Sequence, residues 1–138
     1  MSENGSALVS GQERAFEFEN FELIPARRLL LREGSEVRIG SRAFDLLVAL
    51  VQNAGQVISK EELLTRVWKN VIVEETNLRV HVCILRRLLE DHASQSRFIV
   101  HVARRGYIFV AQMRLTDRRV PHRGRRPAVQ VRQDSQFV

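Results

Sequence analysis

Residues 74–90 read EETNLRVHVCILRRLLE, and this stretch decides the fold. Its large apolar residues follow each other at steps of four, three and four: Leu78, Val82, Leu85 and Leu89. Because an α-helix repeats every 3.6 residues, this spacing places all of them on one face. The pattern therefore predicts an amphipathic helix whose apolar face is buried in a core.

The opposite face of this helix is polar and cationic. It collects Thr76, Asn77, Val80, Cys83, Ile84 and Arg87, with His81 and Leu88 on one shoulder and Arg79 and Arg86 on the other. The acids Glu74 and Glu75 lie in the first turn, where the helix dipole favours negative charge. Such a face can lie in the major groove of DNA. An ordinary solvated helix surface is the alternative.

The charge of the chain is basic but uneven. The 138 residues are 44% hydrophobic, which is enough for one domain of roughly 100 residues with tails. The net charge of +6 favours an anionic partner such as nucleic acid. Residues 114–138, however, carry seven arginines and two aspartates, a net +5, which leaves +1 for residues 1–113. A binding surface on the body must therefore come from local clustering of charge.

Composition argues against several other classes of protein. The single cysteine, Cys83, excludes an intrachain disulfide and a cysteine-based zinc site, and it fits a reducing, cytoplasmic location. No apolar run approaches the roughly 18 residues of a membrane span, so we expect no membrane partner. The four histidines lack zinc-ligand spacing, and no glycine-rich loop could cradle a phosphate. We therefore expect neither enzymatic activity nor a cofactor.

The rest of the chain surrounds the helix with a small sheet and two further helices. Residues 15–39 alternate apolar and polar side chains and predict three or four short antiparallel strands, with a turn at Gly34-Ser35. Ser41 is a candidate N-cap for a helix running to about Asn53, with Gly55 as its stop signal. Ser59 and Glu62 have capping-box spacing and predict a second helix from residue 60 to about 67.

A hairpin and a tail follow the decisive helix. Residues 98–102 and 107–111 are strand-like, and the tight connection between them carries Arg104 and Arg105. From residue 115 onward the periodicity stops, which predicts disorder. This tail either adds nonspecific attraction to nucleic acid or acts as a solubilising end. The predicted organisation is a flexible lead over residues 1–14, one domain over residues 15–112 and a basic tail over residues 113–138.

The order of elements, a small sheet, three helices and a hairpin, is that of an α+β winged helix-turn-helix. Residues 23–110 resemble the C-terminal DNA-binding domain of OmpR/PhoB-type response regulators. The matching segments are PARRL at 25–29, GSRAFDLL at 40–47, GQVISKEELL at 55–64 followed by Val67-Trp68, VEETNLRVHV at 73–82 with LRRLL at 85–89, and RGYIF at 105–109. Segments matched in this order over most of a domain are more specific than one amphipathic helix.

The resemblance implies a set of DNA-binding residues. It places the third helix in the major groove and the hairpin, or wing, at the adjacent minor groove. Positions that approach bases or their flanking phosphates are matched by Thr76, Asn77, Val80, His81 and Ile84. Phosphate-contacting or helix-bracing positions are matched by Arg79, Arg86 and Arg87. The wing tip is matched by Arg104 and Arg105, and phosphate contacts at helix starts by Arg42 and Lys60.

The resemblance also implies a function and partners. They are those of a two-component-like, phosphorelay-linked transcriptional regulator that binds double-stranded DNA and pairs with a second copy on direct repeats. Residues 68–73 resemble the loop through which some family members contact RNA polymerase or DNA. Only about 15 residues precede the first predicted strand, so we expect no receiver domain on this chain. The domain is then freestanding, or cut from a longer chain, or served by a separate sensor.

The sequence departs from the family pattern on the outward face of the third helix. Family members often carry Arg or Lys near the middle of that face, where this chain has Cys83 and Ile84. Val80 and Ile84 could contact thymine methyl groups but give no bidentate hydrogen bond to guanine. A second hypothesis is therefore a winged-helix protein-interaction module with weak or lost DNA binding. In this hypothesis the partly apolar outward face of the third helix docks another protein.

Overall fold

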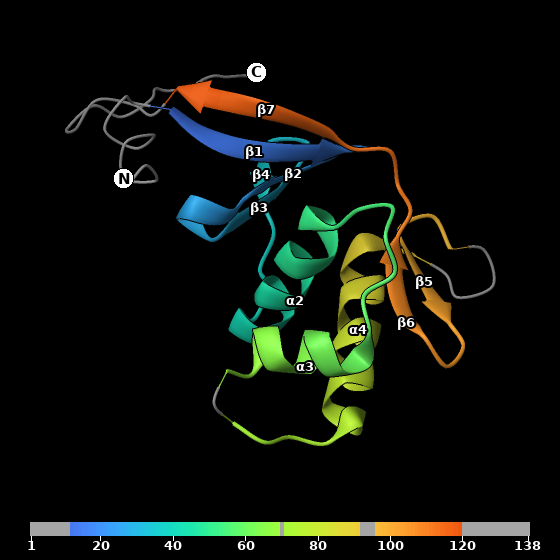
Figure 1. The fold of residues 1–138 in the computed structure, drawn as a ribbon. Helices are drawn as coiled ribbons and strands as arrows, with labels where there is room; N and C mark the ends of the chain where they lie inside the picture. The colour runs from blue at the N-terminus through green and yellow to red at the C-terminus, as the bar shows by residue number, and fades with distance from the viewer. Residues whose placement is uncertain (1–11, 70, 92–95, 120–138) are drawn as a thin grey trace.

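The computed structural model describes residues 12–69, 71–91 and 96–119. Within these residues, an antiparallel sheet lies over one end of a group of three α-helices, and a two-stranded hairpin lies beside the last helix (Figure 1). This arrangement confirms the predicted α+β winged helix-turn-helix. Buried side chains from the sheet, the helices and the hairpin form a common core.

The sheet is built mainly from the N-terminal segment. Its strands are β1 (Gln12–Phe18), β2 (Phe21–Ile24), β3 (Leu29–Arg32), β4 (Ser35–Glu36) and β7 (Arg114–Arg119), in the order β4-β3-β2-β1-β7. A short 3-10 turn, η1 (Pro25–Arg27), joins β2 to β3. The β3–β4 turn lies at Glu33 and Gly34, whose φ angles are 50° and 85°, so the predicted Gly34-Ser35 turn was wrong by one residue. Two successive residues with positive φ suit the twist of a tight hairpin.

Strand β7 corrects the prediction of disorder from residue 115 onward. It pairs antiparallel with β1, and Glu17 lies opposite Arg114 while Arg14 lies opposite Asp117. Such opposite charges across two strands favour the pairing. Strand β1 also starts at Gln12, inside the predicted flexible lead. The predictions for residues 1–11 and 120–138 lie outside the described residues.

The helices agree with the predicted spans. They are α2 (Ser41–Gln52), α3 (Lys60–Val67) and α4 (Glu75–Leu89). The predicted N-cap of α2 was wrong, because Gly40 holds that position and the Ser41 hydroxyl accepts a hydrogen bond from Arg28 at 3.1 Å. The predicted cap of α3 was correct, since the Ser59 hydroxyl accepts from the Glu62 amide at 3.0 Å.

The hairpin is held by aromatic packing. Its strands are β5 (Ile99–Val102) and β6 (Gly106–Phe109), each slightly shorter than predicted. Phe98 and Phe109 pack against Phe18 and Phe21 of the sheet, with contacting ring centroids 5.1–6.3 Å apart. Aromatic pairs at these distances add to the burial of apolar area. This cluster fixes the hairpin relative to the sheet, and the hairpin lies beside α4 (Figure 1).

Candidate nucleic-acid interface

Helix α4 has the two faces that its sequence predicts. Leu78, Val82, Leu85 and Leu89 are buried. On the opposite side, the exposed residues are Thr76, Asn77, Arg79, Val80, Cys83 and Arg87, and Ile84 is half-buried. The apolar stripe therefore holds the helix on the core and leaves its polar side open. With α3 and the intervening loop it forms a helix-turn-helix (Figure 1).

His81 is more constrained than its neighbours on α4. Its Nδ1 atom lies 2.8 Å from the Asn77 carbonyl oxygen, which can only accept, so Nδ1 carries a hydrogen and donates it. The ring also meets Trp68 edge to face, with centroids 5.1 Å apart. These contacts fix the orientation of the imidazole and leave Nε2 as the ring nitrogen available to a ligand.

In the free protein, two of the predicted phosphate-contacting arginines donate hydrogen bonds to backbone carbonyls. The guanidinium of Arg42 donates to the Val67 carbonyl at 3.0 Å and links the start of α2 to the end of α3. The guanidinium of Arg86 donates to the Ile99 carbonyl at 3.0 Å and links α4 to β5, while its Nε is buried without a partner. Both side chains therefore position elements in the free protein, which agrees with the bracing role weighed for Arg86.

Other predicted arginines have side chains without a partner in the described part of the chain. Arg79, Arg104 and Arg105 are exposed, and none of their side chains forms a hydrogen bond or ion pair with another described residue. Arg104 occupies the turn of the hairpin with φ of 66°. Exposed guanidinium groups of this kind are available to phosphate oxygens or to a minor groove.

The wing is fixed to the body at its base. Gly106 has φ of 142°, and a Cβ atom there would lie 1.9 Å from the Ile58 carbonyl oxygen. The next residue, Tyr107, exchanges backbone hydrogen bonds with Ile58 at 3.0 and 2.8 Å. Asp91 is buried and accepts hydrogen bonds from the amides of residues 97–99 at 2.6–3.3 Å. These bonds set where the hairpin starts and where its arginines lie.

An ion pair joins the starts of α3 and α4. The Lys60 ammonium nitrogen lies 2.7 Å from a carboxylate oxygen of Glu75. Its hydrogen bond and charge lower the pKa of the Glu75 carboxyl below the ordinary value of 4.5. The positive charges of Arg79 and His101 act in the same direction. Lys60, a predicted phosphate contact, is therefore paired with an acid of α4 in the free protein.

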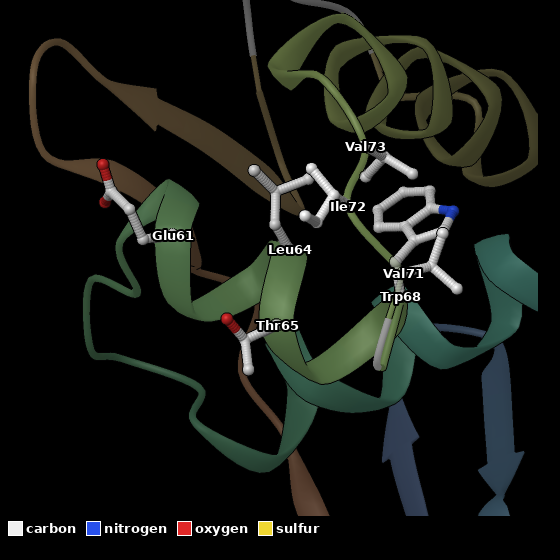
Figure 2. A pocket seen from close by; sticks show the side chains of 7 residues that line it. All are labelled: Glu61, Leu64, Thr65, Trp68, Val71, Ile72 and Val73. Carbon is white, nitrogen blue, oxygen red and sulfur yellow. The ribbon is translucent and has the colours of Figure 1, made fainter.

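An open groove lies beside the interface, between α3 and the loop before α4. It has a volume of about 480 Å³, and the residues lining it are Glu61, Leu64, Thr65, Trp68, Val71, Ile72 and Val73 (Figure 2). Ile72 is fully exposed and Val71 is about half exposed. These two neighbouring apolar side chains are therefore accessible to a partner.

The described residues show neither a metal-binding cluster nor a membrane-spanning helix. No group of three or more His, Cys, Asp or Glu side chains there is arranged to hold a metal ion. None of the described helices is long and apolar enough to cross a membrane.

These observations define a winged helix-turn-helix domain with an open, cationic third helix and an arginine-tipped wing. A model of the family described as "Transcriptional regulatory protein, C terminal" matches residues 34–109, and the chain belongs to that family. The family consists of DNA-binding domains of transcription factors rather than enzymes.

Individual relatives agree with this assignment. The chain is 31% identical over 107 residues to the transcriptional regulatory protein KdpE of Mycobacterium tuberculosis, covering 77% of this chain and 47% of KdpE. It is 33% identical over 101 residues to the phosphate regulon regulatory protein PhoB of Klebsiella pneumoniae, covering 72% of this chain and 44% of PhoB. The chain thus spans less than half the length of these relatives.

A solved structure shares the fold. It is the DNA-binding domain of Klebsiella pneumoniae RstA, crystallised in complex with the RstA box. The TM-score is 0.63 at 26% identity, and the match covers 70% of this chain and 96% of that domain. The likeness therefore extends over nearly the whole RstA domain.

Sequence reasoning missed two side chains near the interface. Glu75 was interpreted as a dipole-stabilising acid, and its partner Lys60 lies 15 positions earlier, a separation that no helical or strand period relates. His101 lies opposite Tyr107 in the hairpin, with ring centroids 5.0 Å apart, and is exposed. Alternation along β5 places His101 on the same side as the buried Ile99, so the strand pattern carried no sign of its exposure.

Proposed function

We propose that this chain is the DNA-binding part of a bacterial-type transcriptional regulator, with α4 in the major groove and the β5–β6 wing at the adjacent minor groove. The observation that carries the proposal is that both elements have exposed arginine side chains without a partner among the described residues. They are Arg79 on α4 and Arg104 and Arg105 on the wing. The major groove of B-DNA, about 12 Å wide, admits an α-helix. The RstA domain, which shares this fold, was crystallised in complex with the RstA box, and this supports a DNA-binding role for the chain.

The proposed roles follow from the chemistry of each side chain. On α4, Thr76, Asn77 and His81 would contact base edges or flanking phosphates. Val80 and Ile84 would contact thymine methyl groups. Arg79, Arg87 and the wing arginines would contact phosphates or the minor groove, with Lys60 joining them after it leaves Glu75. Arg42 and Arg86 would act by holding the elements in place.

The proposal predicts binding that is dominated by phosphate contacts. With about four to six phosphates neutralised, log K should fall with log salt at a slope of about −4 to −5 per protomer. Replacing both wing arginines, Arg104→Ala with Arg105→Ala, should weaken binding to random duplex roughly 10- to 100-fold and reduce the slope by about 2. Fluorescence anisotropy over a salt series measures both quantities.

The matched control removes the same number of arginines from the sheet side of the molecule. Arg97 and Arg114 lie near the carboxylates of Glu19 and Glu17, at 3.2 and 3.8 Å. The Arg97→Ala, Arg114→Ala variant should change binding by less than about threefold. Equal losses in the two double variants would mean that net charge, rather than the α4–wing surface, drives the binding.

We further propose that the loop of residues 68–73 contacts RNA polymerase. Its support is the fully exposed Ile72, which is one of the side chains that line the open groove between α3 and the loop (Figure 2). The Ile72→Ala variant should bind DNA within about twofold of wild type while reducing transcription from a reporter promoter severalfold, since only the apolar contact is lost. Val110→Ala, at an exposed position after β6, is the control. A parallel loss of DNA binding would contradict a polymerase contact.

Two further proposals concern assembly and location. Pairs of protomers would bind in tandem on direct repeats. This predicts that the chain binds two adjacent half-sites more tightly than one. The half-site for this measurement is first selected from a random DNA library. Because chromosomal DNA is the proposed partner, the proposed location is the cytoplasm.

The second candidate function is a protein-interaction module. The half-exposed Val80 on α4, next to the half-buried Ile84, favours this function, because these side chains make the outward face of α4 more apolar. The wing variant separates the two functions. Loss of both wing arginines should abolish most DNA binding but leave an apolar protein contact through Ile84 mostly intact.

A further inference from the structure

An acidic side chain lies inside the cationic α4–wing surface. Glu75, in the first turn of α4, places its carboxylate 2.7 Å from the Lys60 ammonium group, and its side chain is 44% exposed. Lys60 is less exposed, at 27%, and belongs to the first turn of α3. The ion pair therefore links the first turns of α3 and α4, the two helices of the helix-turn-helix that we propose to face DNA.

Three basic side chains act on the Glu75 carboxylate, and its sequence neighbour Glu74 is the acid beside it. Arg79 lies one turn further along α4 and His101 lies on β5, and both lower the pKa of the carboxyl together with Lys60. Glu75 is consequently ionised near neutral pH. A phosphate that approaches this junction meets Lys60 already neutralised and a carboxylate of its own sign.

We propose that Glu75 competes with DNA phosphate for Lys60 and thereby limits the nonspecific affinity of the domain. This inference rests on the proposed DNA-binding function. In the free protein Lys60 donates to Glu75, and on DNA it must exchange that carboxylate for a phosphate oxygen, leaving Glu75 without its partner. Since nonspecific binding depends on phosphate contacts, each cation withheld in this way lowers it and reduces its salt dependence.

The competition acts in a part of the chain that has little net charge. Residues 1–113 carry a net charge of only +1, so nonspecific attraction to this part depends on local clusters of cations. The Glu75 carboxylate beside one of these cations lowers the nonspecific attraction further. A neutral Gln would fill the same space without this effect. The ratio of specific to nonspecific affinity, rather than affinity alone, decides how a regulator is distributed over a genome.

The test uses the full chain and removes only the charge of the competitor. Glu75→Gln should bind random duplex roughly 3- to 5-fold more tightly than wild type, with a salt slope steeper by up to about 1, because one more phosphate is neutralised. Glu74→Gln changes the net charge equally at the neighbouring residue, but Glu74 is the N-cap of α4 and has no ion pair with another described residue. Its effect should therefore be clearly smaller.

A double-variant cycle isolates the pair. Lys60→Gln should weaken binding more in the Glu75→Gln background than in wild type, because only there is Lys60 fully available to phosphate. Equal effects of Glu75→Gln and Glu74→Gln, or an equal cost of Lys60→Gln in both backgrounds, would overturn the inference while leaving the proposed function standing. If wild type does not bind duplex at all, both fail. Thermal unfolding of each variant verifies that it is folded.

Discussion

The α4–wing surface and the sheet differ in how their charges are arranged, although both are rich in arginine. On the sheet side, arginines lie close to carboxylates, with Arg27 2.7 Å from Glu13 and Arg97 3.2 Å from Glu19. On the α4–wing surface, Arg79, Arg104 and Arg105 have no such partner among the described residues. The number of arginines in a region therefore says little about its function, and their pairing says much more.

The same comparison separates arginines within the interface itself. The guanidinium groups of Arg86 and Arg42 donate hydrogen bonds to carbonyl oxygens at 3.0 Å, whereas the side chains of the wing arginines form no hydrogen bond with a described residue. A guanidinium that already satisfies a backbone acceptor loses that bond if it moves to a phosphate. We therefore expect the strongest electrostatic contribution to binding from the wing and from Arg79.

The largest expected effect comes from displacing the wing as a whole. Gly106→Ala should destabilise the fold by about 3 kcal/mol, since a Cβ atom would collide with the Ile58 carbonyl and the φ of 142° is strained for alanine. The melting temperature should fall by roughly 10–20 °C. Differential scanning calorimetry measures this directly.

Gly34→Ala is the matched control for that substitution. Gly34 also has positive φ, at 85°, but nothing lies within 4 Å of the added Cβ. It should cost only about 1 kcal/mol, from backbone strain alone. Equal losses for the two glycines would show that the contact with Ile58 does not hold the wing.

A smaller effect is expected from the brace between α4 and β5. Arg86→Met keeps an apolar stem of similar length but leaves the Ile99 carbonyl without its donor, which should cost about 1 kcal/mol in stability. The salt slope of DNA binding should stay within experimental error of wild type. A slope reduced by about 1 would instead identify Arg86 as a phosphate contact.

Local patterns explain why the helices and part of the interface were predictable. The 3.6-residue period identified the buried side of α4, and hydrogen-bonding at a helix start identified Ser59 as a cap. Both signals act within about one or two turns. The cap of α2 was mispredicted because the Ser41 hydroxyl is engaged by Arg28, 13 residues away in sequence.

The roles of individual charged residues could not be predicted in the same way. Lys60 and Arg86 were expected at the interface, and both lie at its elements, but their partners come from other elements of the fold. The resemblance to a family supplied positions without partners. Whether a given cation is available to DNA depends on the distance to a carboxylate or carbonyl that only the folded chain brings near.

The sequence by itself determined the identity of the helices, the face that each buries and the hairpin that follows them, because periodicity, capping and turn chemistry are local. Tertiary structure decided that residues 114–119 form a strand. Their single exposed leucine gives no pattern, and the strand exists because β1 supplies backbone partners about a hundred residues earlier. It also decided which arginines are held and which are exposed without partners, since that depends on contacts between distant segments.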